Sequence, residues 1–219
     1  MAKNTGRPRR IPRGIVLAAL AAAAAACTLL PAPKATPRTT FLLGPEPGGA
    51  GAATAPCDGG TATLLVTLPR EEPGFDTARM AYLPRPNAVS YYANSQWADT
   101  PARMLAPMIA LALERTGCWR AVVRTPTSVA ADYRLDTEDL VLGQEFFSRP
   151  ARARLALRAV LVDVREERVV AARRFEAAED APEGDAGGGA AAAGRAAAKL
   201  VASLAAWAGE SLPRPADTR

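Results

Sequence analysis

The sequence predicts an α+β domain, in which two helices pack on one face of a mixed, largely antiparallel sheet. About six short runs of β-branched and aromatic residues lie between positions 61 and 175, which is the composition of strands. Two other segments repeat apolar residues at helical spacing, so each presents one apolar face. Short turns join several of the strands directly. Without regular alternation of strand and helix, a doubly wound parallel sheet is not expected.

The first helix is expected to begin near residue 100 and to end before Gly117. Asp99 or Thr100 can cap its amino end, and Pro101 stands where a missing N–H costs nothing. Gly117 is the stop signal, while Pro107 should kink the helix. Its apolar face is made by residues at helical spacing, namely Met104, Leu105, Met108, Ile109, Ala112 and Leu113.

The second helix is expected over residues 190–212. Its apolar stripe consists of Ala193, Ala197, Leu200, Leu204 and Trp207, with Arg195 and Lys199 on the opposite side. Two one-sided helices can bury their stripes only against a shared sheet. The core should therefore contain Leu105, Ile109, Leu113, Leu200, Leu204 and Trp207.

The strands are expected at 61–68, 80–83, 89–92, 119–124, 133–147, 151–164 and 169–175. Turn residues at 84–87 and at Glu166-Glu167 predict two hairpins. Residues 144–150 should form an exposed loop, and residues 177–189, acidic and then Gly-rich, a mobile one. A short edge strand is also expected at 39–43, inside an otherwise Pro-rich stretch.

The amino terminus has the pattern of a bacterial export signal. Its five basic residues precede an apolar run over 15–26, and Ala24-Ala25-Ala26 leads into Cys27. Small residues before a cysteine favour lipidation of Cys27, although Ala24 replaces the usual leucine. Cleavage without lipid remains an alternative. An uncleaved anchor is disfavoured, because residues 15–30 are fewer than the ~20 that a spanning helix needs.

Removing the signal changes the charge balance of the chain. The whole chain has 27 basic and 22 acidic residues, a net charge of +5. All five basic residues of the signal are lost on cleavage, which leaves the mature chain neutral. The high isoelectric point is thus no argument for nucleic-acid binding, which requires a basic face on the folded domain.

The composition argues against an enzyme. The chain has no histidine, which excludes Ser-His-Asp and Cys-His catalytic arrangements and histidine-based zinc sites. No nucleotide-binding GxxxxGK[ST] loop is present, and the acidic pairs stand at adjacent positions, as in solvated turns. We expect no catalytic residue, no metal and no cofactor.

Three cysteines are present. If Cys27 carries lipid, Cys57 and Cys118 form an even pair in an oxidising compartment, where they can make a disulfide. Two separate thiols are the alternative. We divide the chain into a lipoprotein signal peptide (1–26), a Pro/Ala/Gly-rich tether that carries the domain away from the membrane (27–60), a folded domain (61–212) and a flexible tail (213–219).

The stretch from Arg79 to Leu105, RMAYLPRPNAVSYYANSQWADTPARML, carries a family resemblance. Its densest part runs from Tyr91 to Asp99, where aromatic, Trp, acidic and Pro residues succeed one another. With the helix and strand that follow, it resembles the ABC-type transport auxiliary lipoprotein component family. That resemblance implies an accessory subunit paired with a permease or an MCE-type subunit, which moves lipid or other hydrophobic molecules across the bacterial envelope.

The residue types of the same stretch suggest where partners bind. The segment from Tyr91 to Asp99 is expected to form an aromatic and polar corner, and tyrosine and tryptophan are favoured at interfaces. The candidate partner surface is therefore Tyr91, Tyr92, Asn94, Gln96, Trp97 and Asp99. A core role is the alternative, especially for Trp97. A homo-oligomer is left open, and a stand-alone periplasmic binding or scaffolding lipoprotein is the rival function.

The expected location is the periplasmic face of a bacterial membrane, where the lipid on Cys27 would anchor the chain. Thr28 is not the aspartate that favours retention in the inner membrane of some bacteria, so the outer membrane is slightly favoured.

Overall fold

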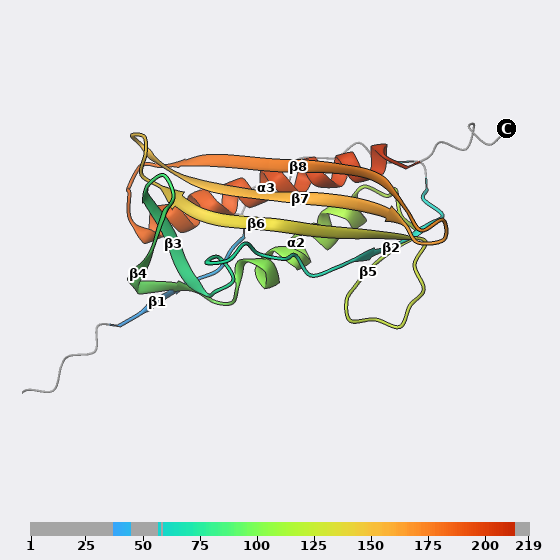
Figure 1. Ribbon diagram of the computed structural model, residues 1–219, viewed down its shortest axis with the longest axis horizontal. Helices are drawn as coiled ribbons and strands as arrows, with labels where there is room; N and C mark the ends of the chain where they lie inside the picture. The colour runs from blue at the N-terminus through green and yellow to red at the C-terminus, as the bar shows by residue number, and fades with distance from the viewer. Residues whose placement is uncertain (1–36, 45–56, 58, 213–219) are drawn as a thin grey trace, which may run out of the picture. The chain divides into compact units, whose positions relative to one another are not determined.

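A computed structural model describes residues 37–44, 57 and 59–212. The described part is an α+β fold with one eight-stranded mixed sheet and two helices, as the sequence predicts. Figure 1 shows both helices on the same face of the sheet. The predictions for Cys27, the signal peptide, most of the tether and the tail concern residues outside the described part.

Three long strands form one side of the sheet. β6 (Tyr133–Glu145), β7 (Ala151–Asp163) and β8 (Arg168–Ala181) pair in antiparallel order, and β8 is an edge strand. The predicted hairpin turn between β7 and β8 is confirmed: Glu167 has a positive φ, and the Asp163 side chain accepts hydrogen bonds from the N–H groups of Arg165 and Glu166.

The other edge of β6 is shared by two short strands that lie end to end. β2 (Thr63–Val66) pairs in parallel with the first half of β6, and β3 (Arg79–Arg85) with its last residues. β5 (Ala121–Arg124) then pairs with β2, and β4 (Ala88–Trp97) with β3 through a hairpin whose turn contains Asn87 at positive φ. β1 (Thr39–Phe41) is the predicted edge strand, and it pairs in parallel with β4.

Helix α2 (Pro101–Arg115) has the ends that the sequence predicts. The Thr100 side chain accepts a hydrogen bond from the N–H of Arg103, Pro101 is the first helical residue, and Gly117 has the positive φ of a helix stop. The helix continues past Pro107, which lies on its exposed side.

Helix α3 (Ala186–Glu210) packs on β7 and β8 and contacts α2. The predicted mobile segment at 177–189 is wrong, because β8 continues to Ala181 and α3 already begins at Ala186. Asp185 caps the helix by accepting a hydrogen bond from the N–H of Gly188 at 2.8 Å. The three consecutive glycines are thus the first turn of a helix.

The predicted core is confirmed. The side chains that were expected to meet between helices and sheet are all at most 8% exposed, namely Leu105, Ile109, Leu113, Leu200, Leu204 and Trp207. Leu135, Leu155 and Leu161 from the central strands complete the same cluster. Burial of this apolar surface between two layers is the main source of stability of such a fold.

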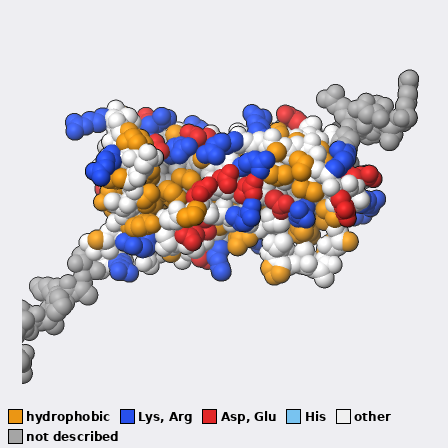
Figure 2. All heavy atoms as spheres, viewed as in Figure 1, with side chains coloured by type: hydrophobic (Ala, Val, Ile, Leu, Met, Phe, Trp, Pro, Cys, Tyr) orange, Lys and Arg blue, Asp and Glu red, His pale blue; other side chains and the backbone are white. Residues whose placement is uncertain are grey.

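The opposite face of the sheet carries charge instead of a second layer of helices. Glu138 pairs with Arg158 and Arg70, and these hydrogen bonds hold the pKa of its carboxyl below the usual value. Arg154 pairs with Glu176 at 2.8 Å across the neighbouring strands. Figure 2 shows acidic and basic side chains gathered across the middle of one face of the molecule. The alternation of arginine with apolar residues along β7 encodes these two faces.

Candidate partner-binding site

The segment that was expected to be a partner surface is the second half of a strand. Residues 91–97 belong to β4, so the predicted corner is wrong up to Trp97, and the chain turns only at 98–100. The pairing with β3 shifts register between Arg79 and Ala81, where β4 contains extra residues. This irregularity lets Tyr92 and Trp97 both pack on the core although they are five positions apart.

Trp97 is a core residue and does not belong to any exposed surface. It is 4% exposed and lines the same small cavity as Met80, Leu142 and Ala193. Tyr91 is half-buried; its hydroxyl donates to the carbonyl oxygen of Gly74 at 2.7 Å, and the Arg79 guanidinium lies 4.1 Å from its ring centre.

Tyr92 is held by a buried glutamine. Its hydroxyl donates to Oε1 of Gln144 at 2.7 Å. Burial, assisted by the negative charge of Asp185, raises the pKa of Tyr92 to about 12. Gln144 was predicted to lie in an exposed loop, but it faces the helices and is 4% exposed. Both tyrosines therefore have structural partners within this chain.

The polar members of the predicted surface are the accessible ones. Asn94 and Asp99 are exposed, and Gln96 is half-buried beside Thr40 of β1. Asp99 accepts a hydrogen bond from the N–H of Thr100 and lies 3.9 Å from the Arg103 guanidinium. Asn94, Gln96 and Asp99 of the candidate partner surface are thus accessible to solvent. Asp99 lies where β4 leads into α2.

Asp99 also lines a surface groove in the described part of the chain. The groove measures about 560 Å³ and lies between the start of α2 and the ends of β2 and β5. Its apolar lining includes Val66, Ala106, Pro126 and Leu68, and Leu68 is 47% exposed. We call this the partner groove, and its full lining is Val66, Thr67, Leu68, Asp99, Arg103, Ala106, Arg124, Thr125 and Pro126.

The partner groove has the composition of a binding surface. Apolar side chains line it, and Asp99, Arg103 and Arg124 add charge. An apolar patch with polar groups around it suits a short helix or an extended segment of another protein. No sequence motif marks the groove, because its lining comes from three elements far apart in the chain.

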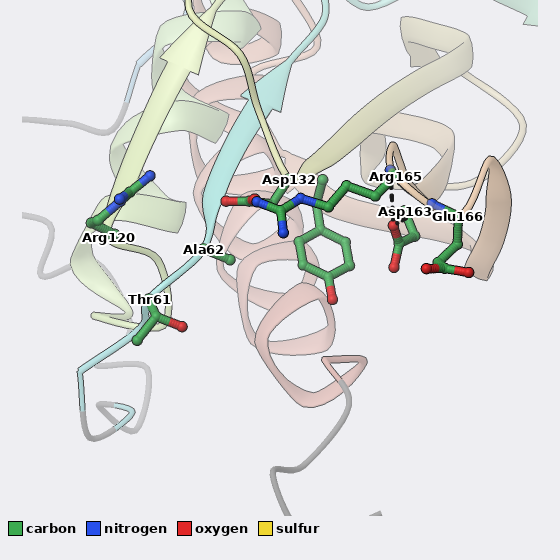
Figure 3. A pocket seen from close by; sticks show the side chains of 8 residues that line it. Thr61, Ala62, Arg120, Asp132, Asp163, Arg165 and Glu166 are labelled. Atoms are coloured by element: carbon green, nitrogen blue, oxygen red, sulfur yellow. Dashed lines mark hydrogen bonds and ion pairs between the residues drawn. The ribbon is translucent and has the colours of Figure 1, made fainter. Parts of the chain in front are cut away.

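A second, polar pocket of about 420 Å³ lies at the end of the sheet where β6 begins. Figure 3 shows Asp132 and Arg165 pointing toward one another, with Arg120 on the other side of the pocket. Asp132 pairs with Arg165 at 2.6 Å and accepts the N–H of Thr63, and Arg120 donates to the Thr63 hydroxyl. These contacts hold four segments together at this end of the sheet, namely the start of β2, the residues just before β5 and β6, and the β7–β8 turn.

Of the two alternatives for Cys57 and Cys118, a disulfide or separate thiols, the structure has the disulfide. Cys57 and Cys118 form a disulfide with their Cα atoms 4.8 Å apart. Cys118 is buried near Gly209 of α3, and the N–H of Cys57 donates to the carbonyl oxygen of Thr116. The bond attaches the chain that leads into β2 to the end of α2.

No group of acidic residues and cysteines within residues 37–44, 57 and 59–212 is arranged to hold a metal ion. Neither helix of the described part is long and apolar enough to cross a lipid bilayer.

The fold and the groove together define a small α+β domain with a partly apolar groove on its surface. The chain belongs to the family of ABC-type transport auxiliary lipoprotein components, whose model matches residues 48–205. The expected family is therefore confirmed. No curated protein is significantly similar to the chain.

Solved structures support the fold. A crystal structure of a Xanthomonas campestris protein is 24% identical, with a TM-score of 0.67 over 79% of this chain and 95% of that one. A second solved structure, of an uncharacterised protein, is 11% identical, with a TM-score of 0.59 over 77% of this chain and 97% of that one. At these identities the likeness concerns the fold alone.

Proposed function

We propose that this protein is an accessory lipoprotein subunit of an ABC transport system that moves lipid or other hydrophobic molecules across the bacterial envelope. The observation that carries the proposal is the family match over residues 48–205. The chain acts by binding a permease or an MCE-type subunit, and it has no catalytic role. The export signal and Cys27 support an anchor on the periplasmic face of a membrane.

The partner groove is our candidate for the contact with the transporter. A partner side chain that enters beside Leu68 would replace water on an apolar surface that no segment of the described residues covers. Asp99 and Arg103 at the groove can fix the orientation of that partner through charge. Tyr91 and Tyr92 are less suitable, because their hydroxyls bond within the chain.

Affinity purification from cross-linked cells tests this function. The tagged wild-type chain should recover a permease or an MCE-type subunit, and the Leu68→Glu/Arg103→Glu variant should recover much less, because a charge enters an apolar contact and a cation is inverted. Val169→Glu is the matched control, since Val169 is 58% exposed on β8, away from the groove. It should recover the partner normally.

Two results would contradict parts of this proposal. Equal recovery by both variants would exclude the groove as the contact while leaving the transporter role intact. If no transporter subunit is recovered and deletion leaves envelope permeability unchanged, the chain acts as a stand-alone periplasmic binding or scaffolding lipoprotein.

A further inference from the structure

Two adjacent phenylalanines are exposed on the connection between β6 and β7. Phe146 is 36% and Phe147 46% exposed, whereas the other three phenylalanines of the chain are buried or half-buried. Val89, 41% exposed, lies just after the tip of the β3–β4 hairpin. An aromatic pair left in water on a protruding connection indicates a surface that something apolar covers.

The hairpin and this connection lie at one end of the sheet. β3 runs parallel to β6 and pairs with its last residues, so the tip that follows β3 is beside the connection that follows β6 (Figure 1). The N–H of Phe146 donates to the carbonyl oxygen of Leu83, and the Phe146 ring packs edge-on against Tyr82 at 5.9 Å. We call this region the aromatic end: Tyr82, Arg85, Val89, Phe146, Phe147 and Arg149.

The aromatic end carries two arginines that are not in ion pairs with any described residue. Arg85 is on the hairpin tip and Arg149 follows the phenylalanine pair, and both are exposed. Two acids near this end have other partners: Glu145, which is paired with Leu83 of β3, lies 3.8 Å from the Arg154 guanidinium, and Asp185 accepts the N–H of Gly188 in the first turn of α3. Neither is in an ion pair with Arg85 or Arg149, so both arginines are available to an anionic surface.

The direction of β1 points to the nature of that surface. β1 is parallel to β4, and β4 runs away from the hairpin tip, so the chain enters β1 from the side of the aromatic end. Cys27 precedes Thr39 by twelve residues. Fully extended, such a segment reaches about 40 Å at most. A lipid on Cys27 would therefore hold Thr39 within that distance of the bilayer, on the side from which the chain enters β1.

We propose that the folded domain rests on the membrane surface through the aromatic end, with Phe146 and Phe147 inserted among the lipid headgroups and Arg85 and Arg149 against anionic phosphates. Aromatic rings favour this depth of a bilayer, and arginines near an anionic leaflet add electrostatic attraction. The inference rests on the lipid anchor of the proposed function. It replaces the expected picture of a tether that carries the domain away from the membrane.

Brominated lipids test the contact directly, because bromine quenches tryptophan fluorescence only at close range. The full-length lipidated chain is reconstituted into vesicles of brominated phosphatidylcholine and phosphatidylglycerol, once as Phe147→Trp and once as Val164→Trp. Val164 is the matched control, since it is 39% exposed at the opposite end of the sheet. The three natural tryptophans are at most 8% exposed and give a constant background. We expect quenching for Phe147→Trp and none for Val164→Trp.

The arginines are tested in the same assay. Replacing Arg85 and Arg149 by glutamine in the Phe147→Trp chain should lower the equilibrium constant for docking about 30-fold on phosphatidylglycerol vesicles. Little change is expected on vesicles of phosphatidylcholine alone. Equal quenching of the Phe147→Trp and Val164→Trp chains, with protein that floats with the vesicles, would overturn the inference and leave this end to a protein partner. Protein that does not float would instead contradict the anchor of the proposed function, and the inference with it.

Discussion

Gln144 connects three parts of the core through one buried amide. It lies on β6, its Oε1 accepts from the Tyr92 hydroxyl of β4, and a Cβ at Gly189 of α3 would lie only 2.3 Å from that oxygen. A side chain at position 189 would therefore force the Gln144 amide to move from its hydrogen bond with Tyr92. A buried amide of this kind stabilises one arrangement of strands and helix only while its hydrogen bonds are made.

Tyr92→Phe should lower the free energy of unfolding by about 1–3 kcal/mol, because it leaves Oε1 of buried Gln144 without a donor. Tyr82→Phe is the control: Tyr82 is half-buried nearby, and within the described residues its hydroxyl makes no hydrogen bond. Urea unfolding of both variants measures the difference. Equal loss in the two variants would show that the hydrogen bond to Gln144 contributes nothing specific.

The same phenol gives a pH dependence. The pKa of Tyr92 is about 12 in the folded chain, above the value of about 10 for a free tyrosine. A raised pKa means that the fold favours the neutral phenol, so its contribution is complete below pH 10 and is lost as the pH rises through 12. Ultraviolet titration should show a phenolate near pH 12 that is missing in Tyr92→Phe, whereas Tyr133, whose pKa is also raised by burial, titrates in both chains. A wild-type titration identical to that of the variant would contradict the assignment.

Replacing Gly194 by alanine sets a steric clash with the backbone against the gain in helix propensity. A Cβ at Gly194 would lie 2.1 Å from the carbonyl oxygen of Gly44, which is backbone and cannot move aside cheaply. Gly194→Ala should therefore destabilise the fold, although alanine is the better helix former by about 1 kcal/mol. Gly187→Ala in the same helix would approach only Asp185 Oδ1, at 3.5 Å, and should be neutral or stabilising. Thermal unfolding compares them, and a stabilised Gly194→Ala chain would contradict the contact.

At the scale of the elements, capping and turn residues predicted where a helix or hairpin ends more accurately than the sequence predicted the lengths of strands and helices. Thr100, Pro101 and Gly117 marked the limits of α2, and the turns after β3 and β7 are at the predicted places. Each of these features depends on the backbone chemistry of a few adjacent residues. Fold class followed from them, because hairpins and one-sided helices leave few other arrangements.

The boundary between β8 and α3 was predicted wrongly because local sequence patterns do not contain tertiary contacts. Residues 177–181 have low strand propensity, yet each pairs with a residue of β7, and Glu179 forms ion pairs with Arg195 and Lys199 of α3. The glycines at 187–189 disfavour a helix locally, but Asp185 caps them and Gly189 fits against Gln144. Contacts with distant parts of the chain determine the strand at 177–181 and the helical turn at 187–189. Such contacts cannot be recognised in a single sequence.

The packing of α3 on the sheet predicts the effect of a buried charge. Leu204 is fully buried, so Leu204→Asp should place an unpaired carboxylate in the core and unfold the domain. Ser203→Asp is the matched control, because Ser203 is the preceding residue of the same helix and is exposed. Circular dichroism and size-exclusion chromatography distinguish the outcomes. A folded, monodisperse Leu204→Asp protein would show that the helix does not depend on this contact.

At the scale of the whole molecule, the candidate site was only partly predictable. Asp99 was expected at a binding surface and lines the partner groove, but Trp97 from the same set is buried. The aromatic pattern of β4 indicated an interface because burial and exposure favour the same residue types. The groove itself depends on the positions of β2, β5 and α2, which no motif encodes.

The disulfide ties distant parts of the chain into one unit, since it joins residues 61 positions apart. Cys57 is exposed, so Cys57→Ala removes the bond with little loss of packing. In the chain-entropy model the variant should be less stable by about 4 kcal/mol, because the unfolded chain regains the freedom of that loop. Urea unfolding with and without a reductant measures this: the reductant should destabilise the wild type toward the variant and leave the variant unchanged. Alkylation of both thiols in the native, unreduced protein would contradict the bond.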